Sequence, residues 1–227
     1  MPLRTADRQY PIGTRYDAPV TEPFRLIVGL SGASGVIYGI RLLEVLADEP
    51  NVETHLVASP AARQTIQLET DRDPDEVEAL ATVRYRYGDI AASISSGSFP
   101  IDAMAVVPCS MGTLSAIATS ASDNLLERAA DVTLKERRPL VLAPREAPLH
   151  LGHLRLMVAV TEMGAIICPP SPAFYSRPES LEQLIDHTVS RMLDVLGIKL
   201  TKPLARRWKG PDEQRAARRT RKSSSSA

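Results

Sequence analysis

The chain has 227 residues, of which 44% are hydrophobic and 24% charged, ordinary values for a globular protein with a substantial core. Its 27 basic and 27 acidic side chains cancel, so no overall charge draws it to nucleic acid or to an anionic membrane surface. No apolar run approaches the roughly 20 residues that a membrane-spanning helix needs. The two cysteines, Cys109 and Cys168, lie far apart in apolar segments, which favours buried free thiols over a disulfide and indicates a cytoplasmic protein.

The sequence divides into three parts. Residues 1–23 contain prolines and little periodicity, and we interpret them as an irregular arm. Residues 209–227 are basic and then serine-rich, a composition that predicts a disordered tail. Between these two segments, over residues 24–208, short apolar runs alternate with helical patterns. The predicted strands are 25–30, 52–58, 104–107, 140–143 and 165–168, with 82–87 as a further candidate.

Helical patterns follow each of these apolar runs. They begin after Gly35 and at Pro60, continue with a short acidic helix, and then cover residues 114–119, 125–137, 151–163 and 179–196. Gly197 supplies the stop signal of the last helix. Such alternation predicts one α/β domain of three layers, with a mainly parallel sheet covered on both faces.

The carboxyl ends of parallel strands lie along one edge of the sheet, where ligands of such folds bind. We therefore expect the functional residues in the segments that directly follow the strands. These segments are 31–35, 59, 108–113, 144–146 and 169–175.

The first segment, within Gly29-Leu-Ser-Gly-Ala-Ser-Gly35, consists of small residues and opens a helix. Backbone N–H groups in such a loop can approach a phosphate at the positive end of the helix. The loop is neither the GxGxxG fingerprint nor a Walker loop, and Ser59 stands where an acidic residue would hold an NAD ribose. A tight structural turn is the alternative, and the loop alone leaves both open.

The segment Ser110-Met-Gly-Thr113 repeats this arrangement at another strand end. Two hydroxyls and a glycine suit a polar ligand that lies across the sheet. Ser110 is equally suited to cap an ordinary helix. Local pattern does not decide between these interpretations.

Arg145 and Glu146 follow the strand predicted at 140–143. In a functional interpretation, Arg145 binds an anion and Glu146 donates a proton from a partly buried pocket. The alternative is an ion pair that stabilises a loop, and a surface pair contributes only ~0–1 kcal/mol. The cluster by itself leaves the two alternatives equal.

Other polar side chains have ordinary explanations when taken singly. Arg128 and Lys135 are two helical turns apart and share one face, which is usually a solvated face. Tyr175 and Arg191 are consistent with a core aromatic and a helix-surface arginine. His150-x-x-His153 has no cysteine or carboxylate partner at metal-ligand spacing, so we predict no metal site.

Taken together, these segments resemble the flavin prenyltransferase family, UbiX/Pad, over about residues 24–208. The central run and the Pro-Arg-Glu cluster are highly specific for the family, whereas the glycine loop occurs in many folds. The resemblance rests on Ser-Gly-Ala-Ser-Gly at 31–35, Pro-Cys-Ser-Met-Gly-Thr-Leu at 108–114, Asn-Leu-Leu-Glu-Arg-Ala-Ala-Asp-Val-Thr-Leu-Lys-Glu-Arg-Arg-Pro at 124–139, Pro-Arg-Glu-Ala-Pro at 144–148 and Phe-Tyr at 174–175.

The resemblance implies a single Rossmann-like (flavodoxin-like) domain that assembles into a homo-oligomer, a dodecamer by this likeness, with FMN at the subunit interfaces. By the same likeness, the phosphate of dimethylallyl phosphate would be held by Arg128, Lys135, Tyr175 and Arg191, some of them from a neighbouring subunit. FMN would be bound by Gly32, Ala33, Ser34, Ser59, Ser110, Met111, Gly112, Thr113 and Arg145.

The implied reaction transfers a dimethylallyl group to N5 and then C6 of reduced FMN, and the prenylated FMN would serve a UbiD-type decarboxylase. Cations are required because negative charge builds up on the departing phosphate. Lys135, Arg128 and a second arginine would supply them. Glu146 would protonate the phosphate, and Ser34 would relay the proton that leaves C6. The resemblance implies no metal, and the sequence has no acidic cluster that could hold Mg²⁺.

Two other functions stay open. A non-catalytic FMN-binding accessory subunit would need the same FMN site. A relative of the flavin-dependent cysteine decarboxylases would carry an early catalytic histidine and a Pro-x-Met-Asn segment, and this sequence has neither. The chain also departs from family members that carry a tryptophan beside the prenyl site, because Ile90 stands there, while Trp208 matches an aromatic that could close the pocket.

Overall fold

The computed structural model describes residues 22–208 and 210, which form a six-stranded sheet in the order β3-β2-β1-β4-β5-β6. All neighbouring strands are parallel, which confirms the predicted α/β fold. The arm predicted at 1–23 lies, up to residue 21, outside the described residues, as does the tail predicted at 209–227 apart from Gly210. The strands are β1 (Phe24–Leu30), β2 (Val52–Ala58), β3 (Val83–Tyr85), β4 (Ala103–Cys109), β5 (Leu140–Pro144) and β6 (Ile166–Ile167).

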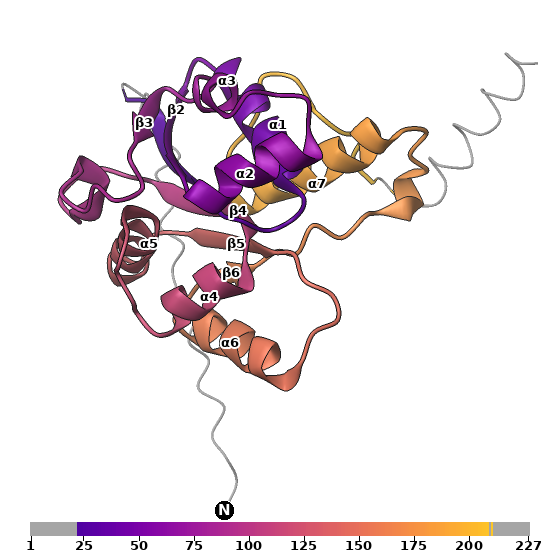
Figure 1. The fold of residues 1–227 in the computed structure, drawn as a ribbon. Coiled ribbons are helices and arrows are strands. Elements are labelled where there is room, and N and C mark those ends of the chain that lie inside the picture. The colour runs from indigo at the N-terminus through magenta and orange to yellow at the C-terminus, as the bar shows by residue number, and fades with distance from the viewer. Residues whose placement is uncertain (1–21, 209, 211–227) are drawn as a thin grey trace, which may run out of the picture.

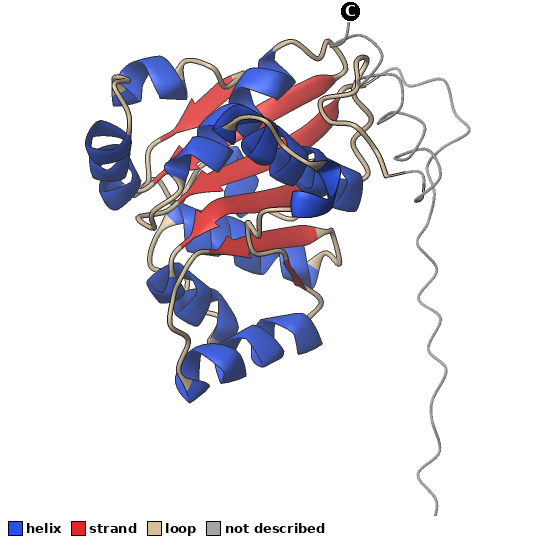
Figure 2. Ribbon diagram, turned by 90° about the vertical axis from the view of Figure 1, so that its right-hand side faces the viewer, coloured by secondary structure: helices blue, strands red, loops and turns tan. Residues whose placement is uncertain are grey.

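Helices cover both faces of the sheet (Figures 1 and 2). One face carries α1 (Val36–Ala47), α2 (Pro60–Glu69) and α7 (Leu181–Leu196), and the short α3 (Pro74–Glu78) follows α2. The other face carries α4 (Met111–Ala118), α5 (Leu125–Lys135) and α6 (Leu151–Glu162). The 3₁₀ turns η1 (Ser93–Ser95) and η2 (Phe174–Ser176) complete the chain. No described helix is long and apolar enough to span a membrane.

Several helix ends differ from their predicted positions. The helix predicted at 114–119 covers Met111–Ala118, because Ser110 caps it, and the helix predicted at 151–163 ends at Glu162. The helix predicted at 125–137 ends at Lys135, because Arg137 adopts a left-handed conformation with φ 57° shortly before Pro139. The helix predicted at 179–196 begins at Leu181, because the Ser180 side chain caps it by accepting a hydrogen bond from the Gln183 N–H. Gly197 ends this helix in the left-handed region, as predicted.

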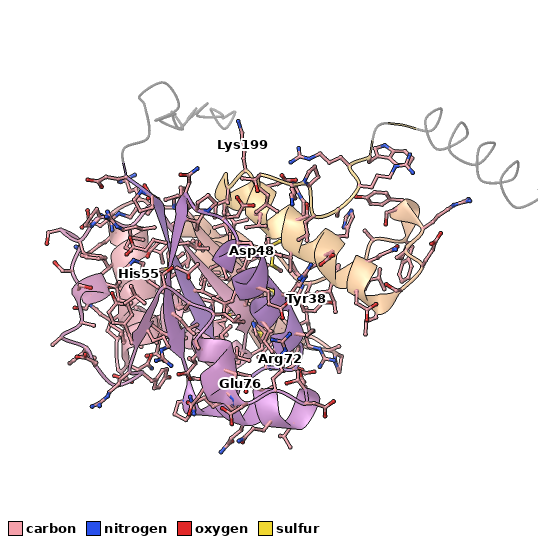
Figure 3. The ribbon with its side chains drawn as sticks, turned by 90° about the horizontal axis from the view of Figure 1, so that it is seen from above. Tyr38, Asp48, His55, Arg72, Glu76 and Lys199 are labelled. Atoms are coloured by element: carbon pink, nitrogen blue, oxygen red, sulfur yellow. The ribbon has the colours of Figure 1, made fainter. Side chains whose placement is uncertain are left out.

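The sheet is buried on both faces, as is usual for parallel sheets. Along β1, Leu26 and Val28 pack with α1 and α7, whereas Ile27 points to the opposite side and packs with α5. Tyr38 on α1 and His55 on β2 mark the two sides in Figure 3. Both faces are largely apolar, so a polar ligand is accommodated more easily where the strands end than on either face.

The segment between β3 and β4 is anchored at both ends. The Tyr85 hydroxyl lies 3.0 Å from His55 Nδ1 and 2.9 Å from the Ser93 hydroxyl. Burial lowers the pKa of His55, so the neutral imidazole is favoured. Further along, Arg138 Nη2 donates to the Gly97 carbonyl at 2.8 Å. These contacts hold η1 against α5.

Gly39 marks the closest approach of α1 to the sheet, because a Cβ there would lie 2.2 Å from the Val107 carbonyl oxygen. That oxygen belongs to the backbone of a central strand and cannot move aside easily. We expect Gly39→Ala to lower the free energy of unfolding by about 1–3 kcal/mol, as overpacking does, although alanine is the better helix former. Urea denaturation measures this change. Gly88→Ala is the matched control, since nothing lies within 4 Å of a Cβ there, and equal stability of the two variants would contradict the prediction.

Candidate active site

The hydroxyl of Ser31 joins the ends of two central strands. It donates to the Pro108 carbonyl at 2.9 Å and accepts the Ser110 N–H at 2.7 Å. On the next strand, the Arg145 N–H donates to the Cys109 carbonyl at 3.4 Å. The strand order reverses between β1 and β4, and in such sheets ligands bind at this point. The predicted segments after β1, β4 and β5 are therefore brought together.

The glycine loop forms a tight turn that is closed by an acidic side chain. Gly35 has φ +93°, which only glycine adopts without strain. The N–H groups of Gly35 and Val36 donate to Glu69 Oε2 at 2.8 and 3.2 Å. A protein carboxylate thus occupies the start of α1, where the sequence suggested a phosphate. Glu69 was not predicted, because no local pattern links it to a loop more than thirty residues earlier in the chain.

Ser59 and Ser110 both cap helices. The Ser59 hydroxyl accepts the Ala62 N–H at 3.0 Å at the start of α2. The Ser110 hydroxyl accepts the Thr113 N–H at 3.2 Å and donates to the Thr113 hydroxyl at 3.0 Å. The capping interpretation of Ser110 is confirmed. It leaves a ligand role open, because a hydroxyl has two acceptor positions and one proton.

The start of α4 differs from that of α1. No acceptor in the described part of the chain takes the N–H groups of Met111 and Gly112. A Cβ at Gly112 would meet only the Ser110 hydroxyl, at 3.9 Å. Free N–H groups at the positive end of a helix, beside open space, suit an anionic or polar ligand.

Arg145 lies over the turn at Gly35, since its Cγ would be 3.9 Å from a Cβ at that glycine. Burial raises the pKa of the neighbouring Tyr38 phenol, and the Arg145 charge opposes this shift. In the described part of the chain no ion pair joins Arg145 to Glu146, whose carboxylate accepts the Ala147 N–H at 3.0 Å. Glu146 is exposed, so residues 22–208 and 210 of one chain do not form the partly buried pocket expected around it.

Arg128 and Lys135 lie on α5 beside η1. Arg128 Nε donates to the Ser95 carbonyl at 3.3 Å, and its Nη1 pairs with Asp131 at 2.9 Å. Lys135 Nζ pairs with Glu136 at 2.7 Å. Their side chains are 37% and 48% exposed.

Lys135 is remote from the edge that carries Arg145. It ends α5, before β5 begins, whereas Arg145 follows the end of β5. A strand of 5 residues spans roughly 17 Å at about 3.3 Å per residue. Within one chain, Lys135 and Arg145 therefore lie towards opposite ends of the sheet.

Tyr175 and Arg191 form a second group on the other face. The Tyr175 hydroxyl lies 2.9 Å from His187 Nε2 on α7, and the Tyr175 ring meets the Trp208 ring edge-on at 5.6 Å. Burial raises the pKa of Cys168, which follows β6, and the Arg191 charge opposes this shift. His187 was not predicted, because the sequence gives it no partner at metal-ligand or catalytic spacing.

The structure therefore brings the predicted FMN residues to one edge but divides the four predicted phosphate residues between opposite faces. Cys109 and Cys168 are both free thiols, as predicted. Among residues 22–208 and 210, no group of three or more histidine, cysteine, aspartate or glutamate side chains could hold a metal ion. The ring centroids of His150 and His153 lie 3.6 Å apart with the ring planes tilted by 35°, and the Nδ1 of His150 accepts the Gly152 N–H at 3.0 Å.

The fold and this edge are those of a flavin-binding protein, and the Flavoprotein family model matches residues 18–194. Flavin prenyltransferase UbiX of Escherichia coli K12 is 62% identical over 186 residues, 82% of this chain and 98% of the relative. The chain therefore belongs to the UbiX flavin prenyltransferases within the Flavoprotein family.

Solved structures agree with this assignment. AnUbiX (PadA1), crystallised with FMN and dimethylallyl pyrophosphate, has a TM-score of 0.81 and 49% identity over 84% of this chain and all of its own. A dodecameric FMN-dependent UbiX-like decarboxylase from E. coli O157:H7 has a TM-score of 0.80 and 50% identity over 82% of this chain and all of its own. The FMN-dependent cysteine decarboxylase TvaF, at 17% identity and a TM-score of 0.53, shares the fold alone.

Open space at Gly112 allows a test of the FMN site that does not disturb the fold. We expect Gly112→Ala to leave the melting temperature unchanged, because its Cβ meets nothing closer than 3.9 Å. If FMN lies against α4, the methyl group should weaken FMN binding about tenfold, equivalent to 1.4 kcal/mol. Fluorescence titration with FMN measures this. Gly88→Ala is the control, and unchanged FMN affinity in Gly112→Ala would place the flavin elsewhere.

Proposed function

We propose that the chain transfers the dimethylallyl group of dimethylallyl monophosphate to N5 and C6 of reduced FMN. The observation that carries the proposal is the single polar edge formed after β1, β4 and β5. There the Ser31 bridge, the open start of α4 and Arg145, whose Cγ lies by the Gly35 turn, come together. This edge has the residues that an anionic flavin needs, in a chain of the flavin prenyltransferase family.

FMN binding is assigned to the loops at this edge. One side of the flavin would be lined by Gly32, Ala33 and Ser34. This loop packs directly on α2, because a Cβ at Gly32 would lie 2.4 Å from the Ala61 methyl group. Ser110 to Thr113 and Arg145 would line the other side, with Ser59 at the start of α2. Bound reduced FMN supplies the nucleophilic nitrogen and carbon of the reaction. The protein's own part is to orient the flavin and to hold its negative charge.

The prenyl donor needs cations where its phosphate leaves, because breaking the allylic C–O bond moves an electron pair to the phosphate. Arg128, Lys135, Tyr175 and Arg191 supply positive charge and a hydroxyl for this purpose. Glu146 would protonate the departing phosphate from the β5 end. Ser34, which is half-buried in the glycine loop, would pass the C6 proton towards solvent.

Two copies of the chain are needed to bring these groups together. Arg128 and Lys135 lie on the α5 face and Tyr175 and Arg191 on the α7 side, so no single subunit can surround one phosphate with all four. We infer a homo-oligomer in which α5 of one subunit faces α7 of another. A dodecamer, the assembly of the E. coli O157:H7 structure, is the arrangement proposed.

The proposal also covers the protein that would use the product, the bounds of the catalytic domain and the cellular location. Prenylated FMN would pass to a UbiD-type decarboxylase. The catalytic domain proposed is residues 24–208. A cytoplasmic location is supported by two free cysteines in one chain, which are typical of a reducing compartment.

The direct test is an anaerobic incubation of purified protein with reduced FMN and dimethylallyl monophosphate. Mass spectrometry should show FMN carrying one added C5 unit, with inorganic phosphate released in equal amount. The diphosphate serves as a second donor. Tight FMN binding without adduct from either donor would instead favour a non-catalytic FMN-binding subunit.

Replacing the proposed proton donor separates catalysis from binding. We expect Glu146→Gln to bind FMN normally but to slow adduct formation about 10²–10⁴-fold, the usual range for loss of a general acid. Single-turnover kinetics measure this rate. Glu162→Gln is the matched control, because Glu162 is exposed at the end of α6, just before β6 begins, and so lies towards the opposite end of the sheet. Equal rates for Glu146→Gln and wild type would remove Glu146 from the mechanism.

A further inference from the structure

Helix α6 presents an apolar stripe at the surface of the molecule. Leu151, Leu154 and Val158 are spaced three and four residues apart, so they share one side of the helix. These three side chains are between 46% and 60% exposed. The opposite side of α6 carries the buried Val160 and the partly buried Leu156, which pack on the core. Because α6 lies at the margin of the molecule, beyond α4, the stripe faces outward (Figure 1).

Two exposed charges of opposite sign lie on the same side of α6. Arg155 comes four residues after Leu151, and Glu162 comes four residues after Val158, so both side chains border the stripe. Neither charge forms an ion pair with another residue of the described chain. The stripe therefore has Val158 between a positive and a negative side chain.

This pattern is complementary to a second copy of the same helix. When two copies of α6 pack antiparallel about a twofold axis near Val158, Arg155 stands opposite the partner's Glu162. The twofold axis repeats this pair on its other side, because an isologous contact uses the same residues of both copies. Parallel packing would place like charges opposite each other, which is unfavourable.

The outer part of the stripe also meets apolar surface in the antiparallel arrangement. Leu151 and Leu154 lie farther from the axis and reach the level at which the partner's α6 ends. Exposed apolar side chains follow α6 there, namely the partner's Met163 and the partner's Ile166, which are 39% and 38% exposed. Ile166 belongs to β6, the last strand of the described sheet, and a second chain would shield this edge.

We propose that α6 packs antiparallel on α6 of a second copy of this chain, about a twofold axis near Val158. This contact is separate from the proposed contact of α5 with α7, which joins two unlike surfaces and by itself generates rings or open chains. A closed assembly of twelve identical chains, unless it is a single ring, also has subunits related across twofold axes. The α6 contact supplies such an axis for the proposed dodecamer.

Disulfide cross-linking tests the axis directly, because a single cysteine can link two copies only where a residue meets itself. We expect Val158→Cys to give a cross-linked dimer as the main product of mild oxidation, seen on a non-reducing gel. Leu151→Cys is the matched control from the same stripe. Its two copies would lie roughly 22 Å apart at 1.5 Å per residue, beyond the reach of a disulfide. Wild-type protein, with its two natural cysteines, is the blank.

A charge at the axis tests whether the contact holds the assembly together. Val158→Glu places two carboxylates face to face, and the mass from sedimentation velocity should fall by a factor of about two or more. Val158→Thr keeps the shape without the charge and should assemble as wild type. Glu162→Gln should also assemble, because charges at the rim of an interface set the register more than the affinity. FMN affinity checks that each variant is folded.

The outcomes separate this inference from the proposed reaction. Leu151→Cys that cross-links as well as Val158→Cys, no cross-link at Val158→Cys, or an unchanged mass of Val158→Glu would overturn the α6 contact. A monomeric wild-type protein would overturn it too, and the adduct assay would still decide the reaction. Protein that cross-links as expected but forms no prenyl adduct would defeat the proposed function alone.

Discussion

The candidate site depends on the spacing between the loops that follow β1 and β4, and the hydroxyl of Ser31 sets this spacing. It links the ends of β1 and β4 through one donated and one accepted hydrogen bond, at the point where the strand order reverses. The helices that follow these two strands lie on opposite faces, so their starting loops diverge and only short-range contacts can fix their spacing. Because Ser31 is buried and both of its contacts are to backbone atoms, the loops keep this spacing whichever side chains occupy their outer surfaces.

The sequence indicated the fold and one edge of the site well. Parallel strands bring their carboxyl ends together, so the positions of Ser59, Ser110 and Arg145 followed from strand assignment alone. Helix capping at Ser59 and Ser110 also follows from local chemistry, because a hydroxyl directly before a helix has N–H groups within reach. These features depend on neighbours in the sequence, or on a rule that applies to every sheet of this type.

Contacts between distant segments could not be predicted in the same way. Glu69 closes the turn at Gly35, and His187 meets Tyr175, without any periodic or motif signal that connects them. For Lys135, the local position within a helix was predicted but the place of that helix against the sheet was not. Its spacing from Arg128 was read correctly as a shared helix face, yet that spacing does not say which end of the sheet the helix reaches, and only the path of α5 against β5 places Lys135 far from Arg145.

The exposure of the charged groups connects chemistry with assembly. Charges that face water attract a phosphate weakly, because the interaction energy of two unit charges falls by a factor of about four between an effective dielectric constant near 20 and that of water. In a single chain Arg145, Glu146 and Arg191 are exposed, and so are the apolar side chains of Phe174 and Leu68. Covering these surfaces with a second chain would bury apolar area and lower the dielectric around the cations in the same step. A site divided between subunits would therefore attract the donor phosphate strongly only in the assembled protein. An isolated chain would then not ionise an allylic ester in a place where water could capture the allylic cation.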